Sequence, residues 1–201
     1  ALDVNNNINW LVVGQVHRDN KLRVLKSFYV KYERILDDLL DDFCKYYQYH
    51  RNKQVAFFFD HTFKGNGFAI NQNDDFYIFI SNFLSSHGWF VDEIYIGRAM
   101  NHIDKAQLIN RMLIGRADHQ VLINRDNNEA LILSIETAGV YMGKKDKRSE
   151  KLAETEEDKL EARTDGSDAF DTLCIGVERH LQPYYSASSG STVTSYFGGQ
   201  T

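Results

Sequence analysis

The sequence predicts one α/β domain built on a mixed sheet, with antiparallel strands first and parallel strands later. Two apolar, β-branched stretches near the start, residues 10–17 and 21–30, are separated by three turn-forming residues, which is typical of a hairpin. The run "QVAFFFDHT" at residues 54–62 has the continuous apolar character of a strand buried on both faces in the middle of a parallel or mixed sheet. Segments with helical periodicity alternate with the later strands.

The composition fits a packed globular domain of 201 residues, 43% of them hydrophobic and 13% aromatic. The net charge of −5 argues against a general polyanion binder, so any contact with nucleic acid would need a local basic patch or metal ions. No apolar run approaches the roughly 18 residues of a membrane span, and no secretory signal is visible. Cys44 and Cys174 lack ligand spacing and are expected to be reduced and buried.

The first elements follow from local patterns. Because the chain opens on Ala1 and enters a strand-like pattern almost at once, we expect a piece of a longer protein, with residues 1–4 starting the first strand of the hairpin. Residues 33–49 place apolar side chains at helical spacing with aspartates between them, which predicts an amphipathic helix with a solvated acidic face.

The later elements alternate in the same way. They are expected as the buried strand 54–62, a helix at 74–85, a strand around 91–96, a helix at 104–113 capped by Asp104, a short strand at 121–123, and a last helix at 167–181 capped by Ser167 and ended by Pro183. Residues 130–137 are ambiguous between strand and helix. The charged stretch 144–163 is expected to be a loop, in part helical, and 185–201 a flexible tail after a domain of residues 1–184.

Acidic residues stand at the ends of several predicted elements. Asp3 lies on the first strand, Asp60 ends the buried strand, and Asp165, Asp168 and Asp171 gather at the start of the last helix. In open α/β sheets, functional groups collect at strand ends and helix starts. Carboxylates that converge there would repel one another, and their hard oxygens suit Mg²⁺ or Mn²⁺. Two such ions, roughly 3.5–4 Å apart, would activate a water and stabilise the leaving oxygen in phosphodiester cleavage.

Each acid also has a structural interpretation. Asp60 is suited to cap the following turn, and Asp3 to be a surface acid beside a turn. At least two of the three aspartates at the last helix are expected only to interact favourably with its dipole. His61 is expected to support the site or lie on the surface rather than act as a ligand. No phosphate-binding loop of the GxxxxGK[ST] type and no Ser-His-Asp or Cys-His set is present.

A basic stretch offers contacts for a nucleic-acid backbone. "GKKDKRSEK" carries five positive charges against two negative, and it is interpreted either as solvated surface or as a hairpin tip that reaches DNA. The candidate contacts are Lys144, Lys145, Lys147 and Arg148. Lys105, on the helix predicted at 104–113, faces either phosphates or water.

Taken in order, these motifs resemble the nuclease domain of the tailed-bacteriophage terminase large subunit, the DNA-packaging enzyme. The resemblance spans residues 1–184 and is carried by "LDVNNNINWLVVGQV", "VAFFFDHT", "NHIDKAQLINRML", "KKDKRSEK" and "TDGSDAFDTLCIGVERH". It implies a ribonuclease H-like fold in which Asp3, Asp60 and Asp168 hold two Mg²⁺ or Mn²⁺ ions. Asp171 is a further metal ligand, and Asp165 or Asp171 is an alternative for the third position.

The resemblance also implies a function and partners. The enzyme would cut concatemeric double-stranded viral DNA in the host cytoplasm at the start and end of packaging, with little sequence specificity. An ATPase motor domain would precede Ala1, and the portal protein and the terminase small subunit would be partners. Two rivals stay open. One is another ribonuclease H-like nuclease, such as a Holliday-junction resolvase, and the other is a non-catalytic assembly module that docks a partner, for example through residues 185–201.

Overall fold

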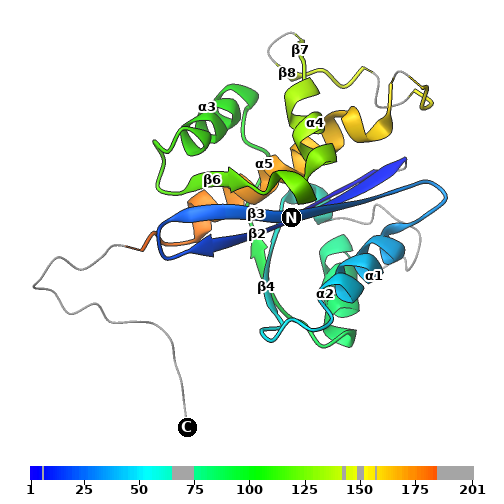
Figure 1. Ribbon diagram of the computed structural model, residues 1–201, viewed down its shortest axis with the longest axis vertical. Helices are drawn as coiled ribbons and strands as arrows, with labels where there is room; N and C mark the ends of the chain where they lie inside the picture. Colours follow the sequence, from blue (N-terminus) through cyan, green and yellow to red (C-terminus); the bar gives the residue numbers. More distant parts are fainter. Residues whose placement is uncertain (6, 65–74, 142–143, 149–151, 157, 185–201) are drawn as a thin grey trace, which may run out of the picture.

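The computed structural model shows an α/β protein with a mixed sheet, as predicted (Figure 1). The structure describes residues 1–5, 7–64, 75–141, 144–148, 152–156 and 158–184. The expected flexible tail at 185–201 lies outside these ranges.

The main sheet has four strands in the order β1-β2-β3-β6. Strands β1 (Leu2–Val4), β2 (Ile8–His17) and β3 (Lys21–Lys31) are antiparallel, and β6 (Gln120–Ile123) pairs in parallel with β3. The predicted hairpin is thus confirmed as β2 and β3. The expectation that residues 1–4 begin the first hairpin strand is wrong, because the chain reverses after β1 and this segment pairs back against β2.

Strands β4 (Gln54–Phe59) and β5 (Phe90–Tyr95) form a second, two-stranded parallel sheet. The prediction of burial on both faces holds only for the last three residues of β4, all phenylalanines with 3–4% of their surface exposed. Gln54 and Ala56 are exposed. The central place predicted for this strand is also corrected, since within the described residues β4 is hydrogen-bonded only to β5. The other edge of β4 borders an apolar groove instead of a strand, so β4 is not central in its sheet.

Helices cover both faces of the β2–β3 ribbon (Figure 1). On one side lie α1 (Leu36–Tyr46) and α2 (Phe76–Ser86), and on the other α3 (His102–Leu113), α4 (Glu129–Thr137) and α5 (Thr164–His180). The short elements are the 3₁₀ turns η1 (His61–Phe63), η2 (Arg125–Asn127) and η3 (Leu160–Ala162), and the strands β7 (Val140–Tyr141) and β8 (Lys144–Lys145). The segment that was ambiguous at 130–137 is therefore helical.

Two helix starts differ from the prediction. Asn101 caps α3 by accepting a hydrogen bond from the backbone N–H of Asp104, so Asp104 lies inside the first turn. Helix α5 begins at Thr164, and Ser167 lies within its first turn, where its hydroxyl donates to the carbonyl oxygen of Thr164. A buried contact accompanies the earlier start of α5. The backbone N–H of Ser167 donates a hydrogen bond to the hydroxyl of Ser134 on the neighbouring helix.

Glycine lets α5 lie very close to β4. A Cβ at Gly176 would stand 2.3–2.8 Å from three carbon atoms of Phe58. At the other end of the helix, a Cβ at Gly166 would stand 3.0 Å from the ring of Trp10 on β2. These two contacts set the position of α5 against both sheets, and with it the position of the aspartates in its first two turns.

Two expectations concern the cysteines and membrane-spanning helices. Cys44 and Cys174 are buried free thiols, as predicted. Among the described helices, none combines the length and the apolar character that crossing a membrane requires.

Candidate functional site

A cleft of about 250 Å³ lies where β1, the end of β4 and the start of α5 meet. Four of the predicted acids line it: Asp3, Asp60, Asp168 and Asp171. They come from three segments that are far apart in the sequence. They meet because β1 and β4 both end at this edge and α5 crosses it.

Asp60 caps the turn that follows β4. Its Oδ1 accepts hydrogen bonds from the backbone N–H of Thr62 at 2.9 Å and from the hydroxyl of Thr62 at 2.6 Å. The structural interpretation of Asp60 is therefore observed, and the same residue also faces the cleft. His61 is exposed, and its backbone N–H donates to the carbonyl oxygen of Gly97, which joins the ends of β4 and β5. The cap and this bond hold Asp60 in place.

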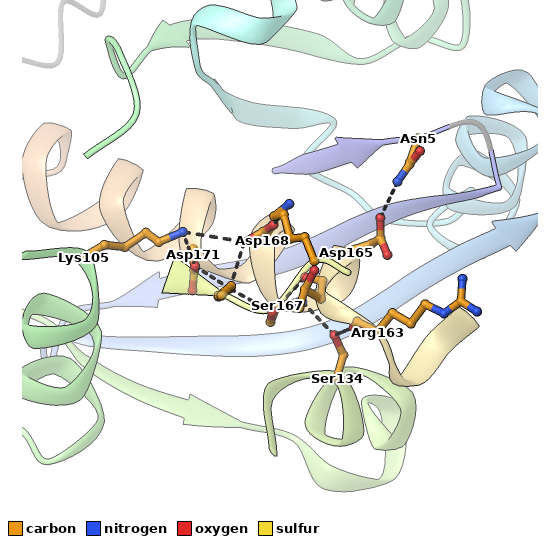
Figure 2. Close-up of polar contacts among 11 residues, drawn as sticks. Asn5, Lys105, Ser134, Arg163, Asp165, Ser167, Asp168 and Asp171 are labelled. Atoms are coloured by element: carbon orange, nitrogen blue, oxygen red, sulfur yellow. Dashed lines mark hydrogen bonds and ion pairs between the residues drawn. The ribbon is translucent and has the colours of Figure 1, made fainter. Parts of the chain in front are cut away.

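Asp168 and Asp171 are paired with lysines (Figure 2). The ammonium groups of Lys105 and Lys145 lie 2.7 and 2.6 Å from Oδ2 of Asp171. Lys145 also lies 2.9 Å from Oδ1 of Asp168, and Lys147 lies 2.6 Å from its Oδ2. The side chains of Asp168 and Asp171 are 18% and 8% exposed. Three cations thus surround two carboxylates in a poorly solvated place, where charge pairs are strong.

The lysines lower the pKa of Asp168. Burial alone would raise the pKa of Asp168, but Lys145, Lys147 and Lys105 outweigh it and bring the pKa down to about 2. Burial would lower the pKa of Lys105, yet Asp171 and Asp168 raise it above its ordinary value. Asp168 and Lys105 therefore both carry charge at neutral pH.

The candidate DNA contacts divide into two groups. Lys105 on α3 lines the cleft, and Lys145 on β8 pairs with the same two aspartates, with 16% and 15% of their side chains exposed. Lys144 is exposed, and Lys147 is 47% exposed although it reaches Asp168. Arg148 is exposed and pairs with Asp146 at 2.6 Å. The basic stretch 144–148 thus pairs Lys145 and Lys147 with aspartates at the start of α5. It leaves Lys144 and Arg148 exposed.

Asp165 lies apart from the cleft. It is 3% exposed, and its Oδ1 accepts a hydrogen bond from the side-chain amide of Asn5 at 2.8 Å (Figure 2). Asp165, Asp168 and Asp171 follow one another at steps of three residues. Because such a step turns a helix by about 300°, each of these aspartates is displaced around the helix by roughly 60° from the one before. Of the three, Asp168 and Asp171 line the cleft and Asp165 ties α5 to the segment after β1.

The donors present in the cleft are suited to a hard divalent cation, because four carboxylates offer the oxygen ligands that Mg²⁺ and Mn²⁺ prefer. The lysine pairs show that two of them, Asp168 and Asp171, attract positive charge. In the present arrangement, the described part of the chain contains no group of three His, Cys, Asp or Glu side chains placed to hold one ion. Lysine ammonium groups balance the charge of Asp168 and Asp171.

Sequence reasoning missed two residues that line the cleft, Arg98 and His102. Arg98 is exposed just after β5, so the strand-end rule that singled out Asp60 would also have found it. A guanidinium there is suited to a phosphate oxygen. The pKa of His102 is lowered by burial, by Lys105 and by Lys144. No pattern in the sequence marks His102.

Comparisons with known proteins assign this chain to no family. No family model matches the chain, and no curated protein is significantly similar to it.

Proposed function

We propose that this chain is a metal-dependent endonuclease that acts on double-stranded DNA. In this proposal it has a ribonuclease H-like fold and the role of the nuclease domain of a tailed-bacteriophage terminase large subunit. The observation that carries the proposal is the cleft in which Asp3, Asp60, Asp168 and Asp171 converge from β1, β4 and α5. An antiparallel hairpin followed by parallel strands also supports it.

The four carboxylates would hold Mg²⁺ or Mn²⁺, which when bound supplies an activated water and stabilises charge on the reacting phosphodiester. Asp60 is held rigidly by its bonds to Thr62. Lys105 and Lys145 pair with Asp168 and Asp171 and fix the orientation of both carboxylates, which a cation site requires.

The DNA backbone would be contacted around the mouth of the cleft. The exposed candidates are Lys147 and Arg98, which line the cleft, and Lys144 and Arg148, which belong to the same basic stretch as Lys147. Because the chain as a whole carries a charge of −5, we expect weak binding by the isolated domain, with affinity that falls steeply as salt rises. The ATPase domain, portal protein and small subunit belong to the same proposal, as does action in the host cytoplasm.

The test is a supercoiled-plasmid assay with Mn²⁺, Mg²⁺ or EDTA on the wild type, Asp60→Asn and Asp126→Asn. Asparagine keeps an oxygen that can accept from Thr62, so the cap and the fold should survive, which a melting curve checks. Asp126 is exposed and does not line the cleft, so its variant is the matched control. We expect metal-dependent nicking in the wild type and the control, and a loss of at least about a hundredfold in Asp60→Asn. Undiminished cleavage by Asp60→Asn would refute the assignment.

One observation favours a second candidate, a non-catalytic assembly module. The ion pairs of Asp168 and Asp171 with lysines are what a purely structural role would produce. Calorimetric titration with Mn²⁺ separates the candidates, since the nuclease should bind Mn²⁺ and lose that binding in Asp60→Asn. A module would not bind it. Running a four-way junction beside linear duplex in the cleavage assay tests the resolvase alternative, which requires preference for the junction.

A further inference from the structure

A second set of basic residues lies where β4 and β5 end, beside the cleft of the candidate site. Lys64 directly follows the 3₁₀ turn η1, four residues after Asp60, and its side chain is exposed. Its ammonium lies 3.5 Å from the ring centroid of Tyr95 and 6.0 Å from that of Phe59. Tyr95 is the last residue of β5 and is 37% exposed. A lysine charge is thus placed over an aromatic ring at the ends of two parallel strands.

The position of this charge relative to the cleft follows from its neighbours. Lys64 directly follows Phe63, which lines the cleft. Tyr95 directly precedes Ile96, which also lines it. Arg98, two residues further along, lines the cleft with an exposed side chain. Lys64 and Arg98 therefore lie at the part of the rim that β4 and β5 form, which we call the strand-end rim.

The two charges of the strand-end rim are available for a ligand. Within the part of the chain that the structure describes, neither Lys64 nor Arg98 forms a salt bridge with a carboxylate. By contrast, the ammonium of Lys145 lies 2.6 Å from Oδ2 of Asp171. A phosphate oxygen has to compete with Asp171 for Lys145, whereas at Lys64 it replaces only a cation–π contact.

The ring of Tyr95 also restricts the lysine. A lysine side chain is long and flexible, and it loses conformational freedom when a ligand fixes it. Because Tyr95 already keeps the ammonium of Lys64 near one place, binding removes less of this freedom. The ring of Tyr95 is in turn held by Phe59, with 5.8 Å between the ring centroids, and Phe59 is only 3% exposed. The charge is therefore carried on a rigid support near Asp60.

We propose that Lys64 and Arg98 form a binding site for phosphates of the DNA backbone, on nucleotides next to the one at the cleft, and that Tyr95 positions Lys64 for this contact. The inference rests on the proposed nuclease function. Phosphates follow one another along one strand of a duplex at about 3.4 Å of helix axis, so a strand whose phosphodiester reaches Asp60 brings neighbouring phosphates to the strand-end rim. Such contacts fix the position and orientation of the duplex but read no sequence.

The test measures binding separately from cleavage. A short fluorescein-labelled DNA duplex is titrated with the full chain in EDTA at several salt concentrations, and fluorescence anisotropy gives the dissociation constant. The variants are Lys64→Gln, Lys64→Arg and Tyr95→Leu. The matched control is Lys45→Gln, because Lys45 is 73% exposed on α1 and does not line the cleft. Melting curves check that each variant folds.

We expect Lys64→Gln to raise the dissociation constant by about threefold to tenfold. It should also reduce the slope of log affinity against log salt by about one, because one phosphate contact is lost. Lys64→Arg keeps the charge and should keep the slope. Tyr95→Leu removes the ring but not the charge, so it should raise the dissociation constant by about twofold without changing the slope. Lys45→Gln should change neither quantity measurably.

An unchanged dissociation constant and slope in Lys64→Gln would overturn the inference. An equal loss in Lys45→Gln would also overturn it, since the effect would then be one of net charge, and so would the absence of measurable duplex binding by the wild type at low salt. Plasmid nicking by the wild type tests the proposed function separately. Nicking together with unchanged binding by Lys64→Gln rejects the strand-end rim alone. A loss of binding specific to Lys64→Gln, without nicking in any metal, supports the phosphate site and rejects the nuclease.

Discussion

Replacing Gly176 by alanine probes the contact that positions α5. The new Cβ would lie 2.3 Å from Cγ, 2.5 Å from Cδ1 and 2.8 Å from Cβ of Phe58, distances that real Cβ atoms do not show. Phe58 is 3% exposed and packed in the core, and one of the atoms met is its Cβ, which moves only with the backbone of β4. Helix α5 and β4 must therefore separate locally.

Two opposing contributions set the magnitude. Alanine in a helix is favoured over glycine by about 1 kcal/mol. Overpacking a close-packed core costs about 1–3 kcal/mol and sometimes more, and the clash with Phe58 falls at the upper end because several atoms are involved. We expect a net loss of about 1–2 kcal/mol, and since a domain of this size shifts by roughly 2–4 °C per kcal/mol, a melting temperature lower by about 2–8 °C.

The assay is thermal unfolding followed by circular dichroism, with Gly139→Ala as the matched control. Gly139 is exposed, and a Cβ there would meet its nearest atom at 3.8 Å, so this variant should melt within about 2 °C of the wild type. An unchanged or raised melting temperature in Gly176→Ala, beside a silent control, would refute the packing argument. If the proposed nuclease is active, Gly176→Ala should also reduce cleavage, because α5 carries Asp168 and Asp171.

A further prediction concerns a buried charge. Arg163, with 2% of its side chain exposed, donates to Asp158 and to the carbonyl oxygens of Leu152 and Ala153. Asp158→Asn leaves the buried guanidinium without its carboxylate and should lower the free energy of unfolding by about 3 kcal/mol, whereas Arg163→Met removes the buried charge and leaves the 41% exposed Asp158 in contact with water, so it should cost clearly less; equal losses would show that the buried charge is not the cause.

Much of the secondary structure could be predicted because its causes are local. The hairpin of β2 and β3 follows from two β-branched stretches around a short turn, and α1 follows from apolar side chains at helical spacing. The residues at which the helices start were harder to predict. The starts of α3 and α5 depend on which side chain accepts a hydrogen bond from a backbone N–H of the first turn. At α5 one such acceptor is the hydroxyl of Ser134, which lies on another helix.

The candidate site was predictable in part. A rule about strand ends and helix starts drew attention to Asp3, Asp60 and the three aspartates at the last helix, and the resemblance singled out Asp168 among these three. The structure brings Asp3, Asp60 and Asp168 to one cleft with Asp171. The roles of the basic residues were not predictable. Lys105 meets Asp171 across 66 residues of sequence, 171 minus 105, so no local pattern reports the ion pair.

The sequence by itself determined the α/β class, the hairpin, the amphipathic helices and the acids worth examining, because periodicity and turn chemistry act over a few neighbouring residues. Only the tertiary structure decided that β1 pairs back on β2 and that β4 stands apart across an apolar groove. It also decided that lysines, rather than solvent, face Asp168 and Asp171. The reason is that strand pairing and charge pairing depend on distance and burial in space, which the order of residues along the chain does not specify.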